Sequence, residues 1–222
     1  MSALLAYHVA LLGRSQRWLA PGILYAVFLA VGVQGGQPVL DSLAYAAAAL
    51  LPVAAWLVRI CATNEPPAAR SCSAAAVGPG RAHLASLLSA FLAASALGVL
   101  AVLVVTVISD GVSTNGRLPV ARVPASAAGL IAMLVSALLG TAVGALTNWP
   151  LLRSAGKSVP TMLLAALLLL VTTGSPAQSA LTDLTTGSRE GVVPWPLGAL
   201  AGAVGAAVAA VWTACALSSR RG

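Results

Sequence analysis

Six long apolar stretches divide this chain, and they constrain its fold more than any other feature. Most of them approach or exceed the ~20 apolar residues that an α-helix needs to cross a bilayer core of ~30 Å. Because 59% of the residues are hydrophobic and only 8% are charged, the composition excludes a soluble globular domain. The stretches cover residues 19–35, 43–61, 84–109, 125–146, 160–173 and 197–217.

The basic residues lie mostly in alternate connectors between these stretches. By the positive-inside rule those connectors are cytoplasmic, so both termini are expected in the cytoplasm. The acids show the opposite bias: Asp41, Asp110, Asp183 and Glu190 lie in the outer connectors, and Glu65 lies inside. The inner basic residues are Arg14, Arg17, Arg59, Arg70, Arg81, Arg153, Lys157, Arg220 and Arg221, and the outer ones are Arg117, Arg122 and Arg189.

The positions of the basic residues also predict what the formal net charge of +7 interacts with. The basic excess follows the cytoplasmic face, where anionic lipid headgroups of the bilayer are its neighbours. No basic patch is interleaved with exposed aromatic residues, so we expect no nucleic-acid binding. We expect a multi-pass protein of the bacterial cytoplasmic membrane, and the Ala-, Gly- and Arg-rich composition is typical of a high-GC bacterium.

The predicted fold class is an all-α membrane protein with six transmembrane helices, an amino-terminal interfacial helix and both termini cytoplasmic. Residues 19–217 form a single transmembrane domain, since no connector is long enough to bury a core of its own. Residues 218–222 are expected to be a cytoplasmic tail. Residues 1–18 fit a short amphipathic helix in the cytoplasmic interface, ending at Arg14, Arg17 and Trp18. Alternatively, they extend the first spanning helix inward.

Two of the connectors are expected to contain structured elements. Residues 62–83 contain an Ala- and Ser-rich piece that two prolines start and Gly78-Pro79 stops, which predicts a helix of two to three turns. Residues 174–196 are too polar to cross a membrane and too apolar for a linker, so we expect a broken, re-entrant or interfacial element on the outer side. Small-residue stripes predict close helix packing at Gly140, Gly144, Gly198 and Gly202.

The spanning stretches lack the chemistry of an enzyme or an ion-coupled carrier. Arg59, at the end of one stretch, is the only ionisable residue that touches them, and neither His8 nor His83 has a carboxylate near it within a membrane helix. Gly156-Lys157-Ser158 is no phosphate-binding loop, because such a loop requires an earlier glycine where Leu151 stands. We therefore predict no catalytic residue, no metal site and no bound cofactor in this chain.

The layout resembles the permease subunits of type-2 ABC exporters, including the haem-exporter-like members. The local match runs from Asn64-Glu65 to Gly80-Arg81-Ala82-His83-Leu84. The resemblance implies a cytoplasmic coupling helix that docks on a separate ATPase subunit, which holds ATP and Mg, and a second permease chain in a homo- or heterodimer. The residues expected to couple to the ATPase are Glu65, Arg70 and Arg81 as a polar rim, with Ala75 and Val77 filling a groove on the partner; a solvated loop without a partner is the alternative.

The resulting function is an ATP-driven exporter subunit, with a non-transporting membrane assembly or binding subunit as the alternative. A mostly apolar pathway suggests an apolar or amphipathic cargo. Polar or aromatic side chains on the spans could line such a pathway, although each also fits ordinary packing or an interfacial anchor. These candidates are Tyr25, Gln34, Tyr45, Trp56 and Thr106.

Overall fold

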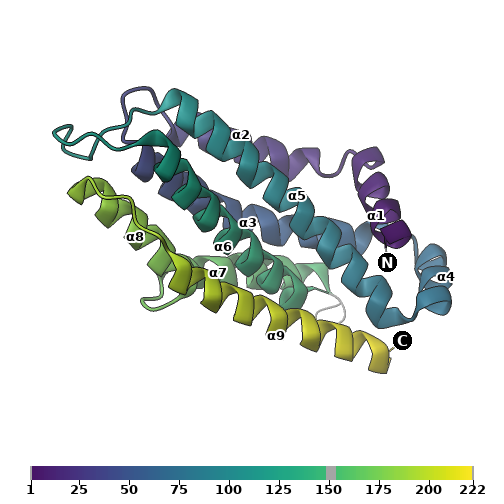
Figure 1. Cartoon of the computed structure of the whole chain (residues 1–222). Coiled ribbons are helices and arrows are strands. Elements are labelled where there is room, and N and C mark those ends of the chain that lie inside the picture. The colour runs from purple at the N-terminus through teal and green to yellow at the C-terminus, as the bar shows by residue number, and fades with distance from the viewer. Residues whose placement is uncertain (1, 149–153, 222) are drawn as a thin grey trace.

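The computed structural model describes residues 2–148 and 154–221, and within these ranges the chain is a bundle of α-helices (Figure 1). Two isolated β-bridges, Pro38 with Asp110 and Val112 with Pro119, are the only β-pairing in the described ranges. The helices are α1 (Ser2–Arg14), α2 (Leu19–Gly32), α3 (Val39–Asn64), α4 (Pro67–Val77), α5 (Pro79–Ile108), α6 (Arg122–Thr147), α7 (Ala155–Val171), α8 (Pro176–Glu190) and α9 (Leu197–Arg221).

Two helices, α3 and α6, form the centre of the bundle. The most apolar window of each is 67% and 72% buried, whereas that of α9 is only 22% buried, so α9 is peripheral. Glycines bring the central pair together: a Cβ atom at Gly140 would lie 2.5 Å from the Leu51 carbonyl oxygen, and one at Gly144 would lie 2.5 Å from Val58 Cβ. The close α3–α6 contact therefore depends on the absence of side chains at these two positions.

Helix length separates the membrane-crossing candidates. Four helices (α3, α5, α6 and α9) are long and apolar enough to cross a bilayer, and the α7–α8 pair, bent by 44°, makes a fifth if it is one broken span. Helix α2 is apolar but has only 14 residues. The described part of the chain thus has the helices of a multi-pass membrane protein.

The bundle has two chemically distinct ends (Figure 1). At the first, here called the α4 end, are α1 and α4, the last turns of α3, α6 and α9 and the first turns of α5 and α7. Asn64 Nδ2 donates to the Leu11 carbonyl over 3.2 Å at this end. At the second, here called the loop end, residues 33–38, 109–121 and 191–196 connect the helices, and the Val39 N–H donates to the Asp110 carbonyl over 3.0 Å.

The basic residues follow this division. Most lie at the α4 end, and the loop end instead holds both partners of the exposed Arg122–Asp110 ion pair, 3.7 Å apart. Arg153 lies outside the described residues. The basic residues at or next to the α4 end are Arg14, Arg17, Arg59, Arg70, Arg81, Lys157, Arg220 and Arg221, and those at the loop end are Arg117, Arg122 and Arg189.

Several boundaries differ from those that hydropathy predicts. The amino-terminal segment is a separate helix, because the chain turns at Gln16, where φ is 52°. The expected tail from residue 218 does not separate from the last helix: α9 continues to Arg221, since no glycine or proline interrupts it there. Residues 174–196 contain α8, a regular helix that the Ser175 side chain caps by accepting from the Gln178 N–H over 3.1 Å.

Candidate functional site

Helix α4 owes its bounds to proline and glycine at its two ends. Pro66 and Pro67 occupy its first positions, where a missing N–H costs no intrahelical bond. At its other end Gly78 adopts φ 89° and ψ 146°, a conformation that L side chains rarely adopt, and Pro79 begins α5 directly afterwards. A sharp corner therefore holds α4 against the start of α5.

The two faces of α4 differ in exposure. The outward face is a stripe of small, exposed side chains at the helical spacing i, i+3, i+4, i+7 and i+8. The opposite face is half-buried against α5, and its Arg70 side chain reaches the end of α3. The outward residues are Ala68, Ser71, Cys72, Ala75 and Ala76, and the inward ones are Ala69, Arg70, Ser73 and Ala74.

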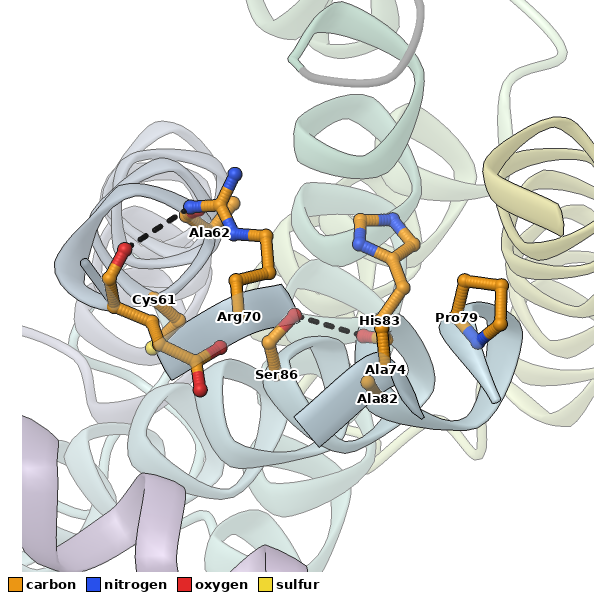
Figure 2. Close-up of a pocket in the computed structure, with 9 residues that line it drawn as sticks. Cys61, Ala62, Arg70, Ala74, Pro79, Ala82, His83 and Ser86 are labelled. Atoms are coloured by element: carbon orange, nitrogen blue, oxygen red, sulfur yellow. Dashed lines mark hydrogen bonds between the residues drawn. The ribbon is translucent and has the colours of Figure 1, made fainter. Parts of the chain in front are cut away.

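A buried carboxylate ties α4 to α3. Glu65, directly after the last residue of α3, is only 6% exposed, and its Oε1 accepts from the Ser73 hydroxyl over 3.2 Å. Arg70 Nη2 donates to the carbonyls of Ala62 and Glu65 over 2.8 and 3.3 Å, respectively. These bonds satisfy carbonyl groups that the end of α3 leaves without intrahelical donors, and the cation also suits the negative end of the helix dipole. Figure 2 shows Arg70 reaching from α4 toward α3.

His8 of α1 lies near Glu65. The imidazole is buried, and burial lowers its pKa below the ordinary 6.5, although the negative charge of Glu65 opposes that shift. Tyr7 lies edge-on to the ring, with the two ring centroids 5.3 Å apart. We call His8, Glu65, Arg70 and Ser73 the Glu65 junction, since it joins α1, α3 and α4.

A small cavity of about 40 Å³ lies beside this junction, between α3, α4 and the start of α5 (Figure 2). Arg70, Ala74 and His83 are among its lining residues, and the Ser86 hydroxyl donates to the His83 carbonyl over 2.7 Å. Pockets for organic ligands measure roughly 300–1,000 Å³, so this cavity is far too small for a cofactor or cargo. It is a packing feature between the three helices.

The structure separates the residues expected to couple to an ATPase into two groups. Ala75, Val77 and Arg81 are exposed at the α4 end, where a partner could contact them. Glu65 and Arg70 do not form an outer rim: Glu65 is buried and Arg70 belongs to the inward face of α4, where the carboxylate and the carbonyl groups at the end of α3 are hydrogen-bonded.

The amino-terminal helix is oriented differently from a free interfacial helix. Arg14, Arg17 and Trp18 are exposed. The buried side of α1, however, holds His8 and Leu12 and packs against α5 and α3, so Leu12 of its apolar stripe contacts protein, whereas Val9 is exposed. Sequence periodicity showed the stripe and could not show what covers it.

The proposed pathway residues do not share one cavity. Tyr25 is 2% exposed and donates to the Ala46 carbonyl over 3.1 Å, which makes it a core residue. The Thr106 hydroxyl donates to the Val102 carbonyl of its own helix, and Gln34 lies in an exposed turn at the loop end. The Tyr45 ring lies against Gly32 of α2.

Tyr25 lines an apolar pocket of about 350 Å³ between α2 and α5, and Trp56 lines a separate apolar pocket. That pocket lies between α2, α3 and α7 and has a volume of about 420 Å³. Except for Arg59, its other lining residues, such as Phe28 and Met162, are apolar and gave no sequence signal beyond membrane-helix composition. Arg59, which the sequence singles out as the one charge touching a span, also lines it.

Of the glycines in α9, Gly198 has no heavy atom within 4 Å of where a Cβ would lie, because it faces outward, whereas Gly202 lies against Pro176 of α8.

Within the described ranges, no group of three or more His, Cys, Asp and Glu residues lies close enough together to hold a metal ion. No protein-family model, no curated protein and no solved structure matches the chain.

Proposed function

We propose that this chain is the permease subunit of an ATP-driven type-2 ABC exporter in the bacterial cytoplasmic membrane. A separate ATPase subunit supplies ATP and Mg, and a second permease chain completes the pathway for an apolar or amphipathic cargo. The observation that carries the proposal is the exposed small-residue face of α4 at the basic end of the bundle. A helix with so little to bury by itself is suited to a groove on a partner.

The course of the chain supports six spans. Asn64 contacts α1 at the α4 end, and α3 begins at the loop end, so α2 has to run the length of the bundle between them. Likewise, the first turn of α7 contacts Thr147 at the α4 end, and the Thr114 N–H donates to the Ser188 carbonyl of α8 over 3.0 Å at the loop end. The α7–α8 pair then forms one broken span.

The shortness of α2 is compatible with this topology. Its 14 residues extend about 21 Å at 1.5 Å per residue, less than the ~30 Å bilayer core. A short span is accommodated by local thinning of the bilayer or by flanking residues, at a modest cost. Trp18, just before α2, is suited to the interface at one boundary.

The basic α4 end is assigned to the cytoplasm by the positive-inside rule, which also places both termini there. In this orientation the exposed face of α4 points toward a cytoplasmic ATPase. A push on α4 would reach α3 through the Glu65 junction and α5 through the Gly78-Pro79 corner. Because α3 is central and packs on α2, α5, α6, α7 and α8, a shift of α3 can change the packing of the whole bundle.

The first test is purification from native membranes in mild detergent. We expect a stoichiometric ATP-binding subunit with vanadate-sensitive hydrolysis. In the reconstituted pair, Ala75→Asp should lower coupled ATPase activity by about tenfold or more, because it places an unpaired charge in a desolvated groove.

Two control variants make the coupling assay specific. Ala75→Ser keeps a small side chain and should retain coupling, while Asn115→Asp adds the same charge at the loop end and should change nothing. Normal coupled turnover in Ala75→Asp would remove the docking role of α4. Recovery of the chain with a non-ATPase membrane complex would favour a non-transporting assembly subunit instead.

A further inference from the structure

We infer that the pocket between α2, α3 and α7 binds an anionic phospholipid from the surrounding bilayer, with the phosphate on Arg59 and an acyl chain along Trp56. This site does not depend on the proposed transport activity, because it requires only the pocket, the cation and a membrane. Its apolar part and its charged part are argued separately below.

The apolar part of the site is a groove open to the membrane-facing surface. Helices α2 and α7 each pack on α3, and the pocket of about 420 Å³ lies between them. Leu24 and Phe28 of α2 and Leu163 of α7 line it and remain exposed to the outside. This volume falls within the range of ligand pockets, roughly 300–1,000 Å³, and an apolar lining suits a hydrocarbon chain.

The charged part of the site is Arg59, three residues after Trp56 and so on the same face of α3. Arg59 Nη1 donates to Ser158 Oγ over 2.8 Å and to Asn148 Oδ1 over 3.1 Å, and both acceptors are neutral. The single ion pair found in the described ranges, Arg122 with Asp110, is at the opposite end of the bundle. Arg59 is therefore held in place without a carboxylate that would neutralise it.

The geometry of the guanidinium leaves donors for a ligand. Arginine carries five N–H groups, and both hydrogen bonds to the described residues start from Nη1, so Nε and Nη2 are available. A phosphate accepts two parallel bonds from such a fork. Ser158 is in the first turn of α7, so the positive end of the α7 dipole adjoins the same place.

Depth in the membrane also fits a lipid. Arg59 lies at the α4 end of the bundle, at the level where a long side chain reaches the headgroups, while the pocket extends along α3 toward Pro52 in the bilayer interior. An occupant needs an anionic group at one end and an apolar chain behind it. An anionic phospholipid supplies both in one molecule and is present in the bilayer without a delivery step.

The test uses Trp56 as the reporter in full-length protein whose other four tryptophans are changed to phenylalanine. The protein is reconstituted into bilayers that contain phosphatidylglycerol or phosphatidylcholine brominated on the acyl carbons nearest the headgroup. We expect Trp56 quenching to show about a fivefold preference for phosphatidylglycerol. Arg59→Gln should abolish that preference, and Arg59→Lys should retain part of it.

Matched variants separate the site from general effects of charge or bulk. Arg81→Gln removes an exposed cation at the same end and Leu164→Phe enlarges a side chain on α7 outside the pocket, so both should leave quenching unchanged. Leu163→Phe narrows the pocket and should weaken quenching by both lipids. Native mass spectrometry of the unsubstituted protein should show a retained phosphatidylglycerol.

Three results would overturn the inference. Equal quenching by the two lipids would mean that Arg59 does not select an anion. An unchanged preference in folded Arg59→Gln, or undiminished quenching in Leu163→Phe if Arg59→Gln fails to fold, would place the lipid elsewhere. Absence of quenching by either lipid would mean that protein, such as a second copy of the chain, covers the groove.

Discussion

Glu65 and His8 show how single residues at the α4 end combine charge with burial. A carboxylate that is 6% exposed would be costly without donors, and Ser73 provides one from α4. His8 comes from a different helix and shares the same low-dielectric surroundings. We therefore expect the contact of α1 with the bundle to depend on the protonation state of His8.

Lowering the pH should weaken this contact. Below its ordinary pKa of 6.5, His8 takes up a proton in the unfolded chain, while burial keeps it neutral in the folded one. The unfolded state then binds more protons, so the free energy of unfolding falls as the pH falls. The melting temperature of the wild type relative to His8→Gln should drop between pH ~7.5 and ~5.5. A difference that stays constant, or rises at acid pH, would show that His8 ionises freely in the folded protein.

Gly144 of α6 has no side chain, and this allows α3 to pack closely against α6. A Cβ there would lie 2.5 Å from Val58 Cβ and 3.0 Å from the Ala55 carbonyl oxygen, so Gly144→Ala must push the central helices apart. We expect a loss of about 1–3 kcal/mol in the free energy of unfolding, as for other overpacked cores. Unfolding in detergent or mixed micelles measures it.

The matched control is Gly205→Ala in α9, where no heavy atom lies within 4 Å of the new Cβ. Alanine there should be neutral or slightly stabilising, because it lowers the backbone entropy of the unfolded chain. If both substitutions cost the same, the α3–α6 contact would not be the reason for the effect at Gly144.

At the scale of the element, α4 and α8 show what local signals achieve. The two prolines at the start of α4 and Gly78-Pro79 at its end predict this helix at nearly the bounds that the structure shows. The segment 174–196 has no equally clear period, and α8 forms there because Ser175 caps it and its buried side, including Leu184, packs on α3 and α6. Capping is visible in the sequence, whereas the surface that receives the helix is not.

Helix α1 is the converse case. Its leucine spacing predicts an amphipathic helix, and the structure contains one. The sequence could not show that Leu12 and His8 face the ends of α3 and α5 and not the lipid, because both surroundings favour the same apolar face. Only contacts between residues far apart in the chain distinguish them.

For the whole molecule, the two ends of the bundle make its orientation testable with one native cysteine. Cys72 is exposed on α4, Cys61 is buried and Cys215 is half-buried. With Cys61 and Cys215 changed to alanine, a membrane-impermeant maleimide should label Cys72 in inside-out vesicles and not in right-side-out vesicles.

The reciprocal experiment places a cysteine at Asn115, in the loop-end connector, in a chain without other cysteines. This cysteine should react in right-side-out vesicles only, because the positive-inside rule assigns the loop end to the outside. The opposite pair of results would invert the molecule and remove α4 from the reach of a cytoplasmic ATPase.

The sequence by itself determined the helical class, the apolar segments and the alternation of basic connectors, since hydropathy and charge are local properties that need no partner. Tertiary structure alone decided that Glu65 and Arg70 turn inward, that Tyr25 is a core residue and that Arg59 meets Asn148 and Ser158 beside an apolar pocket. Those placements depend on packing between helices distant in the chain, and a membrane-helix composition of Ala, Leu and Val leaves many packings equally apolar. The few polar side chains, and the glycines that permit close approach, select among them.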